Sequence, residues 1–277
     1  MTQSVSESHT DHDAWSLGPQ WAAVDWVLTD VDDTLTLHGR LPPQALVALA
    51  ALREQGIEVI AVTGACAGWC DHIAHAWPVS AVIAENGAIV MQKVAGRLQL
   101  HSDRPLAEIR EDQARLRAQI ERILLDYSDL SLTLDQAYRL CEVAIDIGQN
   151  RPSVATETVQ EVLARIHALG AQATASSIHI NAWYGAHSKR TTAMRYLKDH
   201  GLDEASIRRR VCHVGDSPND QPLFEVLPLS VGVANIRRYW EVLSHRPAVV
   251  TPGEGGFGFA QFADQLLALK RLSLIHI

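Results

Sequence analysis

The chain has 277 residues, of which 47% are hydrophobic and 20% are charged, and its formal net charge is −8. This size is sufficient for one large core or two modest ones, whereas the acidic balance argues against a nucleic-acid partner, because binding to a phosphate backbone needs a basic surface. No run reaches the roughly 18–20 apolar residues of a membrane span, and residues 1–15 lack the features of a secretory signal. We therefore expect a cytoplasmic protein with no membrane partner.

The polar segment 1–20 has no hydrophobic periodicity and predicts a flexible tail. After it, apolar runs typical of buried strands alternate with amphipathic helical segments. Pro42 and Pro43 open the first of these helices, and Gly56 follows its end, as helix termini prefer. The predicted strands cover residues 26–29, 57–62, 80–84, 211–214, 229–233 and 248–250. Such alternation predicts a parallel sheet with its reactive crevice at the carboxyl ends of the strands.

The middle of the chain, residues 88–186, has a different pattern. It predicts a hairpin, a long helix, a strand, a second helix and a strand pair, in that order. Paired strands and helices of this kind indicate an α+β unit inserted into the α/β core. The predicted organisation is a tail over 1–20, a core formed by 21–87 and 187–271, and an inserted unit over 88–186. Residues 272–277 are either a native apolar tail or a non-native extension.

The segment Asp30-Val31-Asp32-Asp33-Thr34 follows the first apolar run directly. Two carboxylates two residues apart, just past a strand, can converge on one ligand when the chain turns into a loop. One can attack phosphorus as a nucleophile, and the other can protonate the leaving oxygen and later deprotonate water. By itself the pattern is more often a metal site or a capped turn, so these alternatives stay open.

Three further polar clusters lie at strand ends or helix starts. Thr63-Gly64 offers a hydroxyl and an unobstructed backbone N–H to a phosphate oxygen. Lys189 opens a helical segment, where the positive end of the helix disfavours a cation unless an anion lies nearby. The segment 215–220 supplies two acids and an amide, which suit a hard cation such as Mg²⁺. Each cluster alone is equally consistent with a turn, a solvated helix start or a helix cap.

In this order, the four clusters resemble the haloacid dehalogenase superfamily, specifically its IIB phosphatase branch. That branch includes sugar-phosphate, sucrose-phosphate and mannosyl-3-phosphoglycerate phosphatases. The resemblance covers residues 24–92 and 186–265, and the run 85–88 (ENGA) is also typical of the branch. It implies an α/β fold in which a Rossmann-like parallel-sheet core carries an inserted α+β cap domain over residues 88–186.

The resemblance also implies roles for individual residues. Asp30 would be the nucleophile and Asp32 the general acid and base, with Lys189 neutralising the charge of Asp30. Asp220 would support Lys189. The implied phosphate-binding residues are Asp33, Thr63, Gly64, Lys189 and Asn219. The implied Mg²⁺ ligands are the carboxylates of Asp30 and Asp216 and the main-chain carbonyl of Asp32. Asp33 departs from the Gly that many relatives have at its position.

One strand of the predicted cap alternates cleanly between apolar and polar residues. Its polar face carries one aromatic and three hydrogen-bonding side chains: Ser177, His179, Asn181 and Trp183. This combination suits sugar recognition, although a solvent-facing side of an antiparallel sheet would show the same pattern. Arg139, Glu142 and Asp146 on the neighbouring strand are weaker candidates.

These expectations combine into one functional hypothesis. The chain is predicted to be a Mg²⁺-dependent phosphomonoester hydrolase that forms an aspartyl-phosphate and acts on a small phosphorylated metabolite, such as a phosphorylated sugar or sugar-glycerate. One alternative is a phosphomutase of the same branch, which returns the phosphoryl group to a sugar. A phosphoryl-accepting signalling module or a binding protein is the alternative from a different class.

Overall fold

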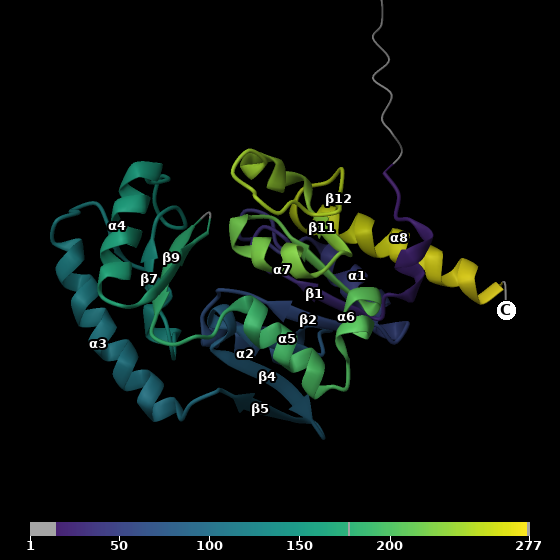
Figure 1. The fold of residues 1–277 in the computed structure, drawn as a ribbon, viewed down its shortest axis with the longest axis horizontal. Coiled ribbons are helices and arrows are strands. Elements are labelled where there is room, and N and C mark those ends of the chain that lie inside the picture. Colours follow the sequence, from purple (N-terminus) through teal and green to yellow (C-terminus); the bar gives the residue numbers. More distant parts are fainter. Residues whose placement is uncertain (1–14, 177, 276–277) are drawn as a thin grey trace, which may run out of the picture.

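The computed structural model describes residues 15–176 and 178–275, and these form two lobes (Figure 1). The larger lobe contains both ends of the described chain, and the smaller lobe is built from the middle of the sequence. Within the described residues, no helix has the length and apolar character needed to cross a membrane. The expected α/β core with an inserted α+β unit therefore describes the architecture.

Among the described residues, eight strands form the sheet of the larger lobe, in the order β12-β11-β10-β1-β2-β3-β4-β5. The strands are β1 (Trp26–Thr29), β2 (Glu58–Val62), β3 (Ala81–Ala84), β4 (Ile89–Val94), β5 (Arg97–His101), β10 (Val211–Gly215), β11 (Ser230–Gly232) and β12 (Val249–Val250). From β12 to β3 all neighbours are parallel. Successive strands after β1 are added on one side of it (β2, β3), and the later strands β10 to β12 are added on its other side. The strand order therefore reverses between β1 and β10, and such a switch point is where open α/β sheets bind ligands.

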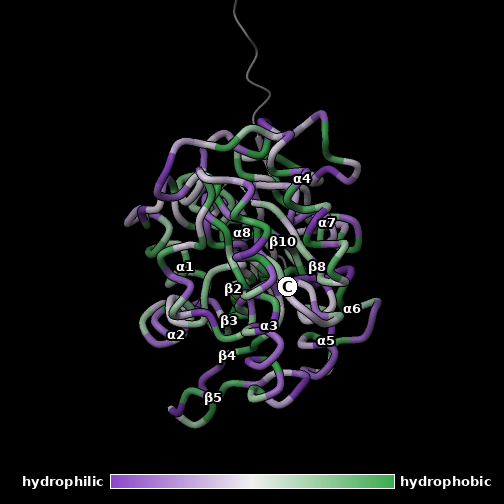
Figure 2. The backbone as a smooth tube through the Cα atoms, turned by 90° about the vertical axis from the view of Figure 1, so that its left-hand side faces the viewer, coloured by the Kyte–Doolittle hydropathy of each residue, from purple (hydrophilic) through white to green (hydrophobic). Residues whose placement is uncertain are grey.

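Helices cover both faces of this sheet. One face packs against α1 (Pro43–Glu54), α2 (Ala67–Ala76) and α8 (Gly255–Ile275). The other face packs against α5 (Lys189–Asp199), α6 (Glu204–Arg210) and α7 (Gln221–Val226). The central strands are therefore buried on both sides, which explains why they are continuous apolar runs and do not alternate. Figure 2 shows these hydrophobic stretches in the interior, around β2, β3 and β10.

The predicted hairpin exists, but it does not join the cap sheet. Its strands β4 and β5 pair antiparallel with each other, and β4 pairs antiparallel with β3 of the larger sheet. The larger sheet therefore continues past the boundary that we expected at residue 88. We propose that the cap begins after His101, because the next element packs with the smaller sheet.

The smaller lobe has a four-stranded sheet with the order β6-β7-β9-β8. Its elements are α3 (Leu106–Leu124), β6 (Ser131–Leu132), β7 (Val143–Asp146), α4 (Thr156–Ala168), β8 (Gln172–Ala175) and β9 (His179–Trp183). Helices α3 and α4 pack on one face through a cluster that includes Leu116, Val162, Ile145 and Ile180. The opposite face of β9 carries His179 and Asn181, as the alternating pattern predicts.

The two ends of the chain differ from the sequence expectations in part. Residues 1–14 of the predicted tail lie outside the described residues. Residues 15–20 are packed, because Leu17 is buried in the core cluster and Trp15 lies against it. At the other end, α8 continues to Ile275, and residues 276–277 lie outside the described part.

Candidate active site

Two aspartates follow the neighbouring strands at the switch point of the larger sheet. Asp30 comes directly after β1, and its N–H donates to the Val214 carbonyl of β10 at 2.9 Å. Asp216 comes directly after β10. Both side chains are buried. The parallel pairing of β1 with β10 thus brings together two carboxylates that are far apart in the sequence.

Lys189 lies against Asp30 although it belongs to a distant helix. Its Nζ donates to Asp30 Oδ1 at 2.7 Å, to Asp220 Oδ1 at 3.2 Å and to Asn219 Oδ1 at 3.3 Å. Ser188 caps the helix by exchanging hydrogen bonds with Thr191, and this cap places Lys189 in the first turn. The unfavourable position of a cation at a helix start is therefore offset by two buried carboxylates.

Burial and mutual repulsion dominate the electrostatics of this cluster. Burial raises the pKa of Asp30 to about 7, Lys189 opposes the rise, and Asp220 and Asp32 add to it. Burial together with Asp30 and Asp220 raises the pKa of Asp216 well above its usual value. Burial would lower the pKa of Lys189, yet Asp220 and Asp30 outweigh it and raise that pKa. Lys189 is therefore protonated, and one Lys charge leaves the carboxylates under-compensated.

The donor set of this cluster fits a hard divalent cation. Asp30, Asp216 and Asp220 each offer a carboxylate oxygen, and these three atoms lie within 4.8 Å of one another. Asp220 is already engaged by Lys189 and by the N–H groups of Asp216 and Ser217. Asp30 and Asp216 thus remain as oxygen donors of the kind that Mg²⁺ prefers. A cation between them would also relieve the repulsion that raises their pKa values.

Asp216 is held in place by Asn235, which the sequence analysis did not name, and by Thr34, to which it gave no role. Asn235 donates from Nδ2 to Asp216 Oδ2 and to the Asp33 carbonyl, both at 3.0 Å. Thr34 donates from Oγ1 to Asp216 Oδ1 at 3.4 Å. The Gly255 N–H in turn donates to Asn235 Oδ1 at 3.0 Å. No local sequence signal marks Asn235, because its contacts join three segments that are distant in the chain.

The two acids after Asp30 have different surroundings. Asp32 lines the same cavity as Asp30, and burial raises its pKa, with Lys189 acting in the opposite direction. Asp33, which we expected to bind phosphate, makes its hydrogen bonds within the loop. Its carboxylate accepts the His38 N–H at 2.9 Å, and its own N–H donates to Thr36 Oγ1 at 3.0 Å. These bonds hold the loop after β1, so the geometry does not support phosphate binding by Asp33.

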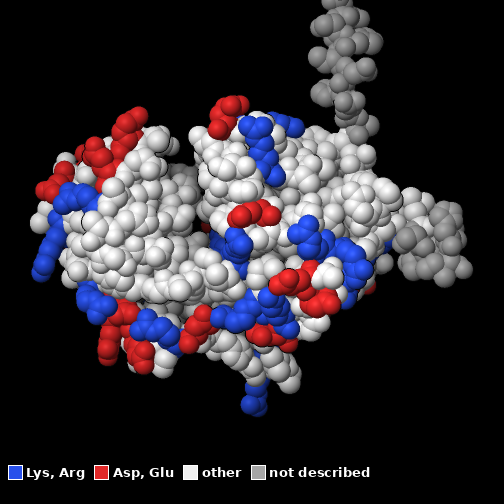
Figure 3. Space-filling model, viewed as in Figure 1, with Lys and Arg blue, Asp and Glu red and all other residues white. Residues whose placement is uncertain are grey.

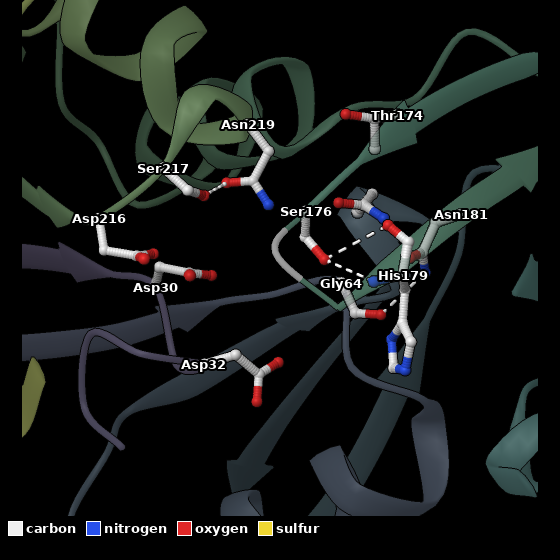
Figure 4. Close-up of a pocket in the computed structure, with 11 residues that line it drawn as sticks. Asp30, Asp32, Gly64, Thr174, Ser176, His179, Asn181, Asp216, Ser217 and Asn219 are labelled. Carbon is white, nitrogen blue, oxygen red and sulfur yellow. Dashed lines mark hydrogen bonds between the residues drawn. The ribbon is translucent and has the colours of Figure 1, made fainter. Parts of the chain in front are cut away.

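The remaining residues that we expected to bind phosphate surround the cavity to different degrees. Gly64 and Asn219 line it, whereas Thr63 is fully buried beneath it and accepts the Ala65 N–H at 3.0 Å. Asn219 Oδ1 accepts from Ser217 Oγ at 2.9 Å as well as from Lys189. The Nδ2 of Asn219 is then the group left for a ligand, and Figure 4 shows it directed towards the cavity.

The cap contributes the opposite wall of this cavity. His179 and Asn181 line it, together with Thr174 and Ser176 of the adjoining segment. Trp183 does not, because its ring stacks on His187 and its Nε1 donates to the His187 carbonyl at 3.2 Å. Ser177 lies outside the described residues. The alternating strand therefore turns its polar face towards the core, not to solvent.

A network between core and cap lies beside this wall. Arg139 donates to the Gly64 carbonyl at 2.9 Å, and Asn86 Nδ2 donates to Glu142 Oε1 at 2.9 Å. Glu85 accepts backbone N–H groups from both lobes: Ala67, Leu140, Cys141 and Glu142, at 2.7–2.9 Å. The sequence analysis named the ENGA run at residues 85–88, Arg139 and Glu142. It did not predict that they meet at the junction between core and cap.

The backbone at this junction is held in an uncommon conformation. Glu85, Asn86 and Gly87 have φ values of +46°, +49° and +106°. The left-handed region costs a non-glycine residue roughly 1–2 kcal/mol. At Gly87 an added Cβ would lie 2.4 Å from the Ser188 carbonyl oxygen, so only glycine fits. The strain places the side chains of Glu85 and Asn86 where they meet the cap.

Eleven described residues line the resulting cavity. They are Asp30, Asp32, Gly64, Asn86, Thr174, Ser176, His179, Asn181, Asp216, Ser217 and Asn219. In Figure 4 the carboxylates stand on one side and the cap residues on the other. Figure 3 shows the molecule hollowed between the two lobes, with acidic and basic side chains interspersed on the face in view. The cavity is polar and lies between core and cap.

Comparisons with known proteins agree with this geometry. The sequence model of the haloacid dehalogenase-like hydrolases matches residues 27–114. The matched residues run from β1 to α3. It is 24% identical over 246 residues to a phosphoglycolate phosphatase of Methanothrix thermoacetophila, and the match covers 88% of this chain and 98% of that protein. These matches bear out the expected resemblance and the expected enzyme class, a phosphatase.

Two solved structures share the fold. A Thermoplasma acidophilum protein has a TM-score of 0.69 at 16% identity, and the match covers 88% of this chain and 98% of that chain. The sucrose-phosphatase of Synechocystis sp., solved with sucrose and phosphate, has a TM-score of 0.62 at 13% identity, with the same coverage. At these identities the likeness is one of fold.

Proposed function

We propose that the chain is a Mg²⁺-dependent phosphomonoester hydrolase that works through an aspartyl-phosphate on Asp30. The observation that carries the proposal is that Asp30, Asp32 and Asp216 line one cavity that the cap covers, with Lys189 paired to Asp30 beside it. Uncatalysed hydrolysis of phosphate monoesters is among the slowest of biological reactions, and enzymes accelerate it up to ~10²¹-fold. Charge neutralisation is the main need, because a phosphate dianion repels an anionic nucleophile.

In the first step, a carboxylate oxygen of Asp30 attacks phosphorus. The new P–O bond forms as the bond between phosphorus and the ester oxygen breaks, and Asp32 donates its proton to the leaving oxygen. In the second step, Asp32 takes a proton from a water molecule that attacks the same phosphorus. Inorganic phosphate leaves, and the carboxylate of Asp30 is restored. The raised pKa of Asp32 suits the first role, since the group must hold a proton before it can donate one.

The other residues bind and orient the phosphoryl group. Lys189 neutralises Asp30 and lies within reach of the phosphate, and Asn219 Nδ2 donates to a phosphate oxygen. Mg²⁺, held by the Asp30 and Asp216 carboxylates and the Asp32 carbonyl, would supply the remaining positive charge. The substrate is a small phosphorylated metabolite, because the cavity is enclosed between the lobes and its cap wall is polar.

The test is phosphate release from a panel of sugar phosphates, glycerate phosphates and phenyl phosphate, with and without Mg²⁺. We expect metal-dependent turnover that Asp30→Asn abolishes, while Asp264→Asn, an exposed aspartate on α8, serves as the matched control and retains activity. An isomeric sugar phosphate without free phosphate would instead assign a mutase. A phosphorylated protein that persists for minutes would assign a signalling module.

A further inference from the structure

Glu142 is a fully buried carboxylate next to the cavity, but it does not line the cavity. Its two oxygens face two amide side chains that do line it. Oε1 accepts from Asn86 Nδ2 at 2.9 Å, and Oε2 accepts from Asn181 Nδ2 at 2.7 Å. Asn86 belongs to the core and Asn181 to the cap. Glu142 therefore sets the orientation of one amide on each side of the junction.

The orientation of Asn181 leaves it no hydrogen to donate. An amide NH₂ has two hydrogens, and those of Asn181 go to Glu142 Oε2 and to the Gly64 carbonyl at 3.1 Å. What Asn181 offers to a ligand in the cavity is its Oδ1, which can only accept. Burial raises the pKa of Glu142 to about 8, and Arg139 opposes the rise. The contacts show both of its oxygens as acceptors, Oε1 from Asn86 and Oε2 from Asn181 and Arg139, and this arrangement keeps the two amide nitrogens turned to Glu142.

The neighbouring His179 adds a second acceptor. Its Nε2 lies 2.7 Å from Gln149 Oε1, which places the ring hydrogen there and leaves Nδ1 as a lone-pair acceptor. Burial, together with the nearby charge of Arg139, lowers the pKa of His179 to about 4 against the opposing effect of Asp135 and Asp146, so the ring is neutral at pH 7. The hydroxyl of Ser176 is used by the His179 backbone, whose N–H donates to it at 3.1 Å and whose carbonyl accepts from it.

No cation balances these acceptors on the cap wall. Among the described residues that line the cavity, none is Lys or Arg. Arg139 is close, but it is buried outside this lining, and four of the five N–H hydrogens of its guanidinium go to Asp135, Glu142 and the Gly64 carbonyl. A carboxylate on the leaving group would thus face the lone pairs of Asn181 and His179, with the Thr174 hydroxyl as the donor that the described cap residues of this lining still offer. A hydroxyl group would find acceptors for its hydrogen.

We propose that Glu142 is a positioning residue that turns the Asn86 and Asn181 amides so that the cavity selects neutral, hydroxyl-bearing leaving groups against carboxylate-bearing ones. The inference rests on the proposed phosphatase function and narrows its substrate class. The inferred substrate preference differs from the activity in the name of the relative called a phosphoglycolate phosphatase, since phosphoglycolate carries a carboxylate beside its phosphate ester.

The test compares two esters that differ only at that position, 2-hydroxyethyl phosphate and phosphoglycolate. For the wild-type chain we expect kcat/KM to be at least about tenfold higher for 2-hydroxyethyl phosphate, as one hydrogen bond to a buried partner is sufficient for such a ratio. In Glu142→Gln the new side chain has one acceptor oxygen and can hold only one of the two amide nitrogens. The other amide can then rotate and present its N–H to the cavity. The ratio of the kcat/KM value for 2-hydroxyethyl phosphate to that for phosphoglycolate should therefore fall about tenfold, mainly through KM.

A merely structural role for Glu142 would lower activity on both esters alike, and an unchanged ratio in Glu142→Gln therefore overturns the proposal. Glu161→Gln, the same change at an exposed glutamate of the cap, is the control and should leave both values unchanged. If Glu142→Gln does not fold, Asn181→Ala takes its place, and loss of the preference for 2-hydroxyethyl phosphate is expected. A wild-type chain that hydrolyses phenyl phosphate but favours phosphoglycolate refutes this inference alone. One that hydrolyses no ester refutes the proposed function as well.

Discussion

Lys189 Nζ lies 2.7 Å from Asp30 Oδ1, in a buried contact that joins residues 159 positions apart. The contact requires that β1 and the first turn of α5 reach the same point from opposite sides of the inserted cap. It also defines where positive charge is available before any metal binds.

Removing the charge of Lys189 should affect both stability and activity. Lys189→Met leaves Asp30 and Asp220 buried without their cation, and breaking a buried pair costs about 3–5 kcal/mol. We expect a lower free energy of unfolding in EDTA and a fall in kcat/KM of at least about 10³-fold. Urea unfolding and phosphate release measure the two effects. Lys198→Met on the same helix is the control, because that side chain is 53% exposed; equal effects of the two substitutions would contradict the prediction.

Asn235→Ala should weaken metal binding more than chemistry. Asn235 donates to Asp216 Oδ2 and thereby orients a proposed metal ligand. Loss of such an orienting hydrogen bond typically reduces metal affinity 10–100-fold. A Mg²⁺ titration of activity should show a midpoint shifted upward by about this factor, with much of kcat recovered at saturating Mg²⁺. If the midpoint stays at its wild-type value, Asn235 is not required to orient the Asp216 carboxylate for metal binding.

Glu85→Gln should loosen the attachment of the cap. The Glu85 carboxylate accepts four N–H groups, and the amide that replaces it has a single acceptor oxygen. We expect a loss of about 2–3 kcal/mol in unfolding free energy and faster hydrogen exchange at the amides of residues 140–142. Unchanged exchange at these amides would show that the junction is held by its other contacts. Glu54→Gln, at the exposed end of α1, controls for the loss of one negative charge.

His187 should make the protein sensitive to mild acid. Burial lowers the pKa of His187 to about 4, and Arg104 and Arg195 add to this, while Asp103 opposes it. The folded state therefore keeps the ring neutral, whereas the unfolded chain binds a proton below about pH 6.5. Stability from this residue is present above pH 6.5 and is lost as pH falls towards 4. Because the ring is partly exposed, we expect a loss of about 1–2 kcal/mol.

The measurement compares His187→Phe with the wild type across this pH range. Phenylalanine keeps the stacking on Trp183 and removes the titration, so the difference in unfolding free energy should shrink or reverse as pH falls. A difference between variants is needed because Asp30, with its raised pKa, acts in the opposite direction between pH 4 and 7. An exposed histidine, His72, provides the control as His72→Phe, and the same pH slope in both variants would rule out His187 as the source.

The sequence predicted the core more fully than the junction between the lobes, for physical reasons. Asp30 and Asp216 were predictable because each stands just past an apolar run, and strand ends in a parallel sheet meet at one edge. The contacts of Asn86 with Glu142 and of Arg139 with Gly64 span 56 and 75 residues. They depend on how the cap docks, and no local periodicity encodes docking.

Two expectations rested on local patterns that leave the tertiary contacts open. A hairpin pattern over residues 88–101 shows that two strands pair with each other, but it does not show which sheet they join. Asp33 was assigned to phosphate by its place in the motif, whereas its hydrogen-bonding groups are occupied by Thr36 and His38. The face of β9 was predicted correctly because alternation alone determines it.

The position of β1 between β2 and β10 has a consequence for how the protein is made. During synthesis, β2 follows β1 after about 30 residues, but β10 emerges more than 180 residues later. Until then one edge of the most central strand has no partner, and an unpaired apolar edge invites association with other chains. The ribosome thus releases Asp30, the proposed nucleophile, early and its acidic neighbour Asp216 late. The active site can fold only after the last third of the chain has been made. A prematurely terminated product would contain Asp30 but would lack Lys189 and Asp216.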